Sequence, residues 1–109
     1  MITLQQGSTL QGGRYRIERV LGQGGFGITY LAEDCVARQK VAIKEFFMRD
    51  YCSRDESTAM LTETVSRGNE MVATYKRKFI KEAKTLSSLN HPNVVRVFGD
   101  FEENGTAYY

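Results

Sequence analysis

Between Arg14 and Ala32 the sequence reads RYRIERVLGQGGFGITYLA. In its first part, residues 14–20, the pattern is that of a strand: Tyr15, Ile17 and Arg19 are expected to point one way, and Arg16, Glu18 and Val20 the other. Its last part, residues 28–32, is rich in the β-branched and aromatic residues that favour extended backbone. The run GQGGFG between them is predicted to be a loop of five or six residues. The two strands are therefore expected to form an antiparallel hairpin.

Three glycines of this loop, Gly22, Gly24 and Gly27, follow the spacing GxGxxG. Glycines let the backbone approach phosphate oxygens closely while its N–H groups point at them. A dinucleotide-binding site has the same spacing but needs a helix directly after it, whereas residues 28–31 predict a strand. This argues against a nicotinamide-dependent enzyme. A flexible glycine hairpin without a ligand remains the alternative for the motif taken alone.

A lysine interrupts the third predicted strand, Val41–Phe47, which is apolar except at Lys44 and Glu45. Strand alternation places Lys44 on the same face as Ala42, whose small side chain leaves room beside the ammonium group. The alternative is a lysine at the end of a strand that extends into solvent.

A glutamate lies on the apolar face of the long helix predicted from Asn69, as its cap, to about Leu89. Glu82 stands three residues after Phe79 and four before Leu86. Because an unpaired buried charge is costly, we expect Glu82 to pair with Lys44. A solvated Glu82 at the edge of the apolar face is the alternative. The apolar face itself is predicted to consist of Tyr75, Phe79, Ala83, Leu86 and Leu89.

The remaining segments complete an α+β fold, with a five-stranded antiparallel sheet packed on one long helix. The capping-box pattern Ser53-Arg54-Asp55-Glu56 predicts an extra short helix that ends near Gly68. The fourth and fifth strands are expected at residues 94–98 and 106–109, with a turn at residues 102–105. Residues 1–13 are predicted to be a flexible leader and residues 14–109 the domain. Because the chain stops inside a strand, we expect it to be a piece of a longer protein.

Composition sets broad limits on the function. The 109 residues are 41% hydrophobic and 26% charged with a net charge of +2, as in an ordinary globular domain. There is no apolar run of membrane-spanning length, and the first 13 residues do not resemble a signal peptide. The two cysteines, Cys35 and Cys52, show no metal-ligand spacing, so we expect free thiols, a cytoplasmic protein and no metal site. The basic cluster at residues 76–78 is too small to predict nucleic-acid binding, and we expect no membrane contact by this segment.

Taken together, these motifs resemble the N-terminal lobe of a protein kinase. The residues 21–27, LGQGGFG, are similar to the glycine-rich loop of that family, and residues 41–44, VAIK, match its third-strand motif. Residues 79–83, FIKEA, and 86–95, LSSLNHPNVV, resemble its C-helix and the turn into the fourth strand. The wording GGFGITYLA is similar to bacterial serine/threonine members, and the resemblance extends over residues 14–109.

The resemblance implies a function and a set of site residues. A kinase of this type would transfer the γ-phosphate of ATP, with Mg²⁺, to serine or threonine of a protein substrate. The loop Leu21-Gly22-Gln23-Gly24-Gly25-Phe26-Gly27 would cover the nucleotide, and the backbone N–H groups of residues 24–27 would hold its β- and γ-phosphates. Lys44 would bind the α- and β-phosphates while paired with Glu82, and Leu21, Thr29 and Ala42 would line the adenine pocket.

The sequence departs from the family pattern in three respects. Thr29 stands where valine is usual, and the stretch between Lys44 and Glu82 is longer than usual. Nothing in the chain resembles H-R-D-x-x-x-x-N or D-F-G, so the catalytic base and the Mg²⁺ ligands are expected in a C-terminal lobe, and this chain alone is expected to be inactive. A pseudokinase that only binds is the alternative, although both Lys44 and Glu82 are present. A homodimer of the isolated lobe is a further hypothesis, because the apolar surface that the other lobe should bury would then be exposed.

Overall fold

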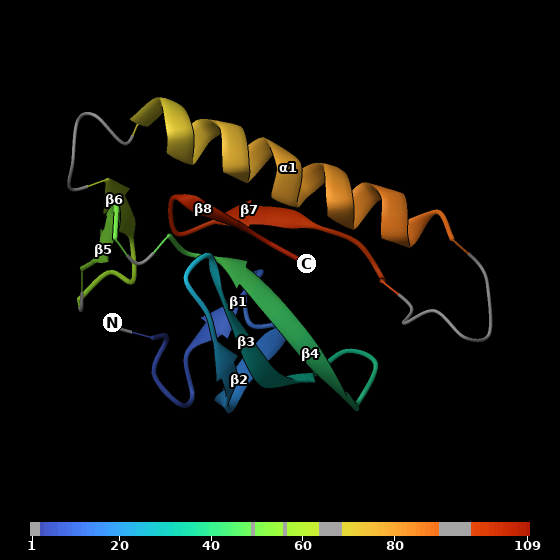
Figure 1. Ribbon diagram of the computed structural model, residues 1–109. Coiled ribbons are helices and arrows are strands. Elements are labelled where there is room, and N and C mark those ends of the chain that lie inside the picture. Colours follow the sequence, from blue (N-terminus) through green and yellow to red (C-terminus); the bar gives the residue numbers. More distant parts are fainter. Residues whose placement is uncertain (1–2, 49, 56, 64–68, 90–96) are drawn as a thin grey trace.

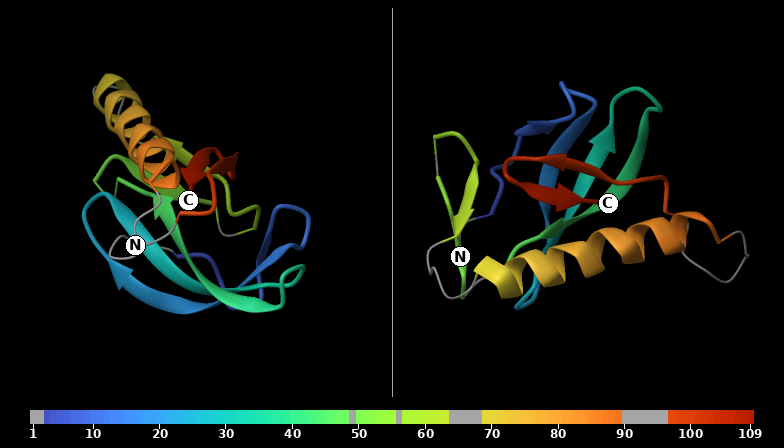
Figure 2. Two further views of the ribbon diagram at one scale, coloured as in Figure 1. Left: turned by 90° about the vertical axis from the view of Figure 1, so that its right-hand side faces the viewer. Right: turned by 90° about the horizontal axis from the view of Figure 1, so that it is seen from above.

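One curled antiparallel sheet and one long helix make up most of the structure, a computed structural model that describes residues 3–48, 50–55, 57–63, 69–89 and 97–109 (Figure 1). The strand order in the sheet is β1-β2-β3-β4-β8-β7, and a separate pair, β5-β6, lies beside it. Helix α1 runs along the side formed by β7 and β8 (Figures 1 and 2). The elements are β1 (Thr9–Leu10), β2 (Tyr15–Gln23), β3 (Gly27–Asp34), β4 (Gln39–Phe46), β5 (Cys52–Arg54), β6 (Leu61–Glu63), α1 (Asn69–Ser87), β7 (Phe101–Glu103) and β8 (Thr106–Tyr108).

The predicted α+β class, the glycine hairpin and the long helix are confirmed. Strands β2 and β3 pair antiparallel, and β3 begins at Gly27, where a dinucleotide site would need a helix. The connecting loop is shorter than expected, because β2 continues through Gln23 and leaves only residues 24–26 between the strands. Two register shifts, at Glu18 and at Leu21, bend β2 and help the sheet to curl.

The first 13 residues differ from the predicted flexible leader. Thr9 and Leu10 form β1, which pairs with β2. Leu4 and Leu10 are buried in the main hydrophobic core, and the Leu4 N–H donates to the Tyr30 hydroxyl at 3.1 Å. The two leucines cover the inner face of the curled sheet, and their packing there removes apolar surface from water. The structural unit therefore includes residues before Arg14.

A side-chain contact joins the two ends of the curled sheet. The backbone N–H and the side-chain amide of Gln11 both donate to one carboxylate oxygen of Glu103 in β7, at 2.8 and 2.9 Å. The rings of Tyr15 in β2 and Phe101 in β7 stack nearby, with centroids 5.9 Å apart. These contacts link β1 and β2 to β7, the strand at the other end of the sheet order.

The predicted short helix after residue 53 is wrong for the residues that are described, because β5 and β6 form a hairpin there. Asp55 does not start a helix; it holds a turn by accepting bonds from the N–H groups of Ser57 at 2.8 Å and Thr58 at 3.3 Å. Ala59 has a positive φ of 63°, which is incompatible with a continuing helix. The last part of the predicted helix, residues 64–68, lies outside the described residues.

The sheet also has more strands than the predicted five. Residues 97–98 are not in a strand, and the rest of the expected fourth strand, residues 94–96, lies outside the described residues. The strand next to β8 is instead β7, and the turn between them is only Asn104-Gly105, both with positive φ. Asn-Gly favours this two-residue hairpin turn. Gly105 is also required by packing, since a Cβ there would lie 2.7 Å from the carbonyl oxygen of Leu61.

Helix α1 packs on the sheet through part of its predicted apolar face. Phe79 and Ala83 are buried, together with Val72, which was not in the predicted set. Tyr75 and Leu89 remain 38% and 47% exposed. Two ion pairs tie the helix to the sheet side, Lys76–Glu102 at 3.0 Å and Lys84–Asp100 at 3.8 Å. Among the described residues, no helix combines the length and apolarity needed to cross a membrane.

A buried carboxylate, Glu45 of β4, connects four parts of the chain. Its side chain is fully buried and pairs with the Arg54 guanidinium of β5 at 2.5 Å. The hydroxyls of Tyr30 and Tyr108 donate to its two oxygens at 2.8 and 2.5 Å. Arg54 also donates to the carbonyl oxygen of Ala59 at 3.2 Å. The charge is thus compensated by one cation and two hydroxyls, as burial requires.

The same environment shifts the ionisation of the residues around Glu45. Burial, and then the charge of Glu45, raises the pKa of Tyr108 and of Tyr30 well above the ordinary tyrosine value. Burial alone would lower the pKa of Arg54, but the bond to Glu45 and its charge outweigh burial and raise this pKa. All three side chains therefore stay in their hydrogen-bonding forms over the normal pH range.

Replacing Arg54 with methionine should strongly destabilise the fold. The variant keeps the apolar volume but leaves Glu45 buried without its cation, so we expect the free energy of unfolding to fall by about 3–5 kcal/mol. Urea denaturation measures this loss. Arg19→Met is the matched control, because Arg19 is exposed and has no ion pair among the described residues. Equal stability of the two variants would contradict the role of the pair.

A second carboxylate, Asp34 at the end of β3, holds the turn into β4. It accepts from the N–H groups of Val36 at 3.0 Å and Ala37 at 3.1 Å, and from the Arg14 guanidinium at 3.3 Å. The Ala37 N–H, followed by Arg14 and the Val36 N–H, lowers the pKa of Asp34 against the opposing effect of burial.

The free energy of unfolding should therefore fall in acid as the Asp34 carboxylate becomes protonated. Its folded pKa is lower than its unfolded pKa, so its contribution is present above the unfolded value, about 3.9, and is lost as pH falls through the folded value. In Asp34→Asn we expect lower stability at neutral pH and a flatter decrease below about pH 4. Thermal unfolding between neutral and acid pH measures the difference. Parallel pH profiles for parent and variant would contradict it.

Candidate functional site

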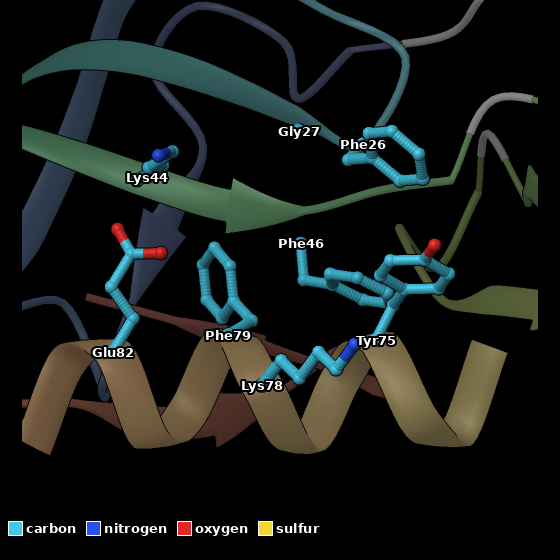
Figure 3. A pocket seen from close by; sticks show the side chains of 8 residues that line it. All are labelled: Phe26, Gly27, Lys44, Phe46, Tyr75, Lys78, Phe79 and Glu82. Atoms are coloured by element: carbon cyan, nitrogen blue, oxygen red, sulfur yellow. The ribbon is translucent and has the colours of Figure 1, made fainter. Parts of the chain in front are cut away.

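A cavity of about 190 Å³ lies between the glycine hairpin and α1 (Figure 3). It brings together four of the expected site residues, Phe26, Gly27, Lys44 and Glu82, from the glycine loop, β3, β4 and α1. The aromatic residues around them come from the same elements. The lining residues are Phe26, Gly27, Lys44, Phe46, Tyr75, Lys78, Phe79 and Glu82.

Lys44 of β4 lies between Thr29 of β3 and Tyr109, the residue that follows β8. In the sheet register it pairs with Thr29 of β3. On its other side it exchanges two backbone hydrogen bonds with Tyr109, at 2.7 and 3.0 Å. The neighbouring row, Ile28, Glu45 and Tyr108, points into the core. Because successive side chains of a strand point to opposite faces, burying Glu45 leaves Lys44 on the open face.

Glu82 lies on the same side of the sheet as Lys44 but does not pair with it. In Figure 3 its carboxylate extends from α1 toward β4. The described residues include both side chains, and no ion pair within 4.0 Å joins them. Glu82 is exposed rather than buried, so its charge does not require the cationic partner that burial would have demanded. Its carboxylate instead accepts a hydrogen bond from the Tyr109 hydroxyl at 2.7 Å.

The ring of Tyr109 lies between the lysine and the glutamate. Its face is 5.6 Å from the Lys44 ammonium, a cation–π distance. It packs against the ring of Phe79 on α1 with centroids 4.8 Å apart. Burial, followed by the bond to Glu82 and the charge of that residue, raises the pKa of Tyr109 above its ordinary value. The hydroxyl is therefore a donor at neutral pH.

The glycine loop contains an internal hydrogen bond and packs against α1. The Gly24 N–H donates to the carbonyl oxygen of Gly27 at 2.9 Å, so this amide is turned into the loop. The ring of Phe26 contacts Tyr75 of α1, with centroids 5.1 Å apart. A Cβ added at Gly22 or Gly25 would meet no atom within 4 Å. The fold therefore does not need glycine at those two positions for space.

A second, larger cavity of about 710 Å³ lies on the open face of the sheet. Its lining includes Thr29, Ala42, Lys44 and Tyr109, which places two of the three expected adenine contacts together. Leu21, the third, is 45% exposed and lines neither cavity. The loop residues Gly22, Gln23, Gly24 and Gly25 also line neither cavity.

Sequence analysis missed two important side chains. Glu45 could have been found by its position, because it follows Lys44 in an apolar strand and alternation directs it to the opposite, buried face. Tyr109 was expected only as the last residue of the fifth strand. No sequence signal reports its contact with Glu82, since that depends on where α1 packs.

Comparisons with known proteins agree with this architecture. The chain is 37% identical over 97 residues to the serine/threonine-protein kinase PrkC of Bacillus subtilis. The match covers 89% of this chain and 12% of that protein. It is 36% identical over 96 residues to the serine/threonine-protein kinase PknD of Chlamydia caviae, covering 88% of this chain and 8% of that protein. No family model matches the chain.

The fold has a close counterpart among solved structures. The structure of PpkA-294 in its apo form matches with a TM-score of 0.90 at 31% identity, and the match covers 97% of this chain and 37% of that one. This chain spans only a small part of each of these relatives. By its sequence and its fold, the chain is the N-terminal lobe of a protein kinase and resembles the bacterial serine/threonine-protein kinases.

Proposed function

We propose that this lobe binds ATP for a kinase that phosphorylates serine or threonine residues of proteins. The observation that carries the proposal is the meeting of Lys44, Glu82 and the glycine hairpin around one cavity. A cation and a glycine loop at one site suit a polyphosphate, and phosphoryl transfer depends mainly on such positioning and charge stabilisation. The similarity to kinases over most of the chain supports the same function.

In this proposal the open face of β3 and β4 receives the nucleotide. The 710 Å³ cavity lies within the usual size range of small-molecule sites. Thr29 and Ala42 would contact the adenine from above, and Leu21 would complete that surface. Lys44 would bind the α- and β-phosphates from its place in the same lining. The β- and γ-phosphates would lie under residues 24–27, where the open space at Gly25 permits close approach of the backbone.

The remaining parts of the reaction would come from outside this lobe. A C-terminal lobe would supply the catalytic base and hold the Mg²⁺ that neutralises the phosphate charge. It would also bind the protein substrate and cover apolar side chains such as Phe98, which is 67% exposed here. We further propose that the lobe acts in the cytoplasm, where ATP is available. In the absence of the other lobe, the same apolar surface would favour a homodimer.

A second candidate function is a lobe that binds nucleotide without supporting catalysis. The observation that favours it is the lack of an ion pair between Lys44 and Glu82, a contact that active kinases require. Phosphoryl transfer by the parent kinase separates the two candidates.

Lys44→Met in the kinase that contains this lobe should lower phosphoryl transfer by orders of magnitude. The variant removes the cation that orients the α- and β-phosphates but keeps the length of the side chain. Incorporation of labelled phosphate into a protein substrate measures the effect. Lys81→Met is the matched control, because Lys81 is an exposed lysine on α1 with no ion pair among the described residues. Equal activity of the Lys44 variant and the parent would remove Lys44 from this role.

Gly25→Ala should separate ligand binding from stability. The structure leaves space for the added Cβ, so we expect the free energy of unfolding to change by less than about 1 kcal/mol. The KM for ATP should rise, because the methyl group occupies the place where the backbone approaches the phosphates. Urea denaturation and steady-state kinetics measure the two effects. An unchanged KM would argue for the loop as a hairpin without a phosphate-binding role.

A further inference from the structure

Among the described residues, the hydroxyl of Tyr109 is the one hydrogen-bond or ion-pair partner found for the carboxylate of Glu82. The distance is 2.7 Å, and the oxygen that accepts the bond is Oε1. Glu82 is exposed and has a long side chain, so without this bond its carboxylate is expected to sample several rotamers in water. A hydrogen bond to a charged acceptor is among the stronger side-chain contacts.

The position of Tyr109 is itself fixed from three sides. Two backbone hydrogen bonds to Lys44 hold its main chain in the sheet. The ring packs against Phe79 of α1 on one side, and the Lys44 ammonium lies 5.6 Å from the ring centroid. An acceptor held by this hydroxyl is therefore held on the same face of the sheet as Lys44. Tyr109 thus connects β4, through its backbone bonds to Lys44, with α1, through its hydroxyl bond to Glu82.

We propose that Tyr109 is a positioning residue that holds Glu82, and with it this turn of α1, where the carboxylate can reach Lys44. The inference rests on the proposed kinase function, because it concerns the pair that phosphoryl transfer requires. Only Oε1 is engaged by Tyr109, which leaves the other carboxylate oxygen for the ammonium. Tyr109 acts through Glu82 and touches no phosphate in this proposal.

The first test is Tyr109→Phe in the kinase that contains this lobe. The variant keeps the ring and its packing and removes only the hydroxyl. We expect kcat/KM for phosphoryl transfer to fall on the order of tenfold, the effect of losing a hydrogen bond to a charged group, while the unfolding temperature stays close to that of the parent. Tyr51→Phe is the matched control: Tyr51 is partly buried, and no hydrogen bond to its hydroxyl is found in the described part of the chain.

A double-mutant cycle with Glu82→Ala tests whether the hydroxyl acts through Glu82. In that background, Tyr109→Phe should have no further effect on kcat/KM, because the acceptor is already gone. An equal loss in both backgrounds would overturn the inference. So would a Tyr109→Phe enzyme as active as the Tyr51→Phe enzyme. A more active Tyr109→Phe enzyme would also overturn it, since the hydroxyl would then be holding Glu82 away from Lys44.

A second measurement tests the hydrogen bond between Tyr109 and Glu82 without relying on kinase activity. NMR of ¹³C-labelled tyrosine in the 109-residue chain follows the ionisation of the Tyr109 hydroxyl. Besides burial, the bond to Glu82 and its charge keep the pKa of this hydroxyl raised. We expect Glu82→Gln to lower that pKa, and the control Glu70→Gln, in the first turn of α1, to leave it unchanged. No change in Glu82→Gln would overturn the inference. An inactive parent kinase with the expected titration would contradict the proposed function alone.

Discussion

The buried charge of Glu45 is the constraint on which the rest of this lobe depends. A carboxylate in a hydrophobic core requires partners, and the chain supplies them from β3, β5 and β8. Arg54 can reach Glu45 only if the segment after β4 returns to the sheet, and the β5–β6 hairpin places it there. To deliver Tyr108, β8 must lie beside β4 in one register. One polar group thus fixes the position of several elements that share no sequence motif.

The same constraint sets the orientation of the candidate site. Lys44 and Glu45 are adjacent, so a strand that directs Glu45 inward must direct Lys44 outward. The charge of Glu45 is neutralised inside the core, whereas the charge of Lys44 stays available to a ligand. Tyr108, the last residue of β8, and Tyr109, which follows it, repeat the arrangement: Tyr108 is bound to Glu45 and Tyr109 to Glu82. Sliding either strand by one residue would exchange the two faces.

The sequence predicted the parts of the structure that depend on local patterns. Alternation, the glycine run and the helical period of residues 69–89 gave the hairpin, the third strand and α1. The short helix after residue 53 was predicted wrongly because Asp55 with Ser57 and Thr58 can hold a turn as readily as a helix start. Tertiary contacts chose between them, through Arg54 and Glu45. The expected ion pair of Lys44 with Glu82 is not formed in the structure, which brings both residues to one cavity but joins Glu82 to Tyr109.

The packing of Leu4 and Leu10 has a practical consequence for anyone who shortens this protein. A boundary placed at Arg14, where the kinase-like motifs begin, would remove both leucines from the core and the N–H donor from the Tyr30 hydroxyl. That hydroxyl belongs to the shell around Glu45, so the damage would reach β4 and the strand that carries Lys44. Expression of a trimmed lobe would then yield aggregated or poorly folded material for a reason unconnected with nucleotide chemistry.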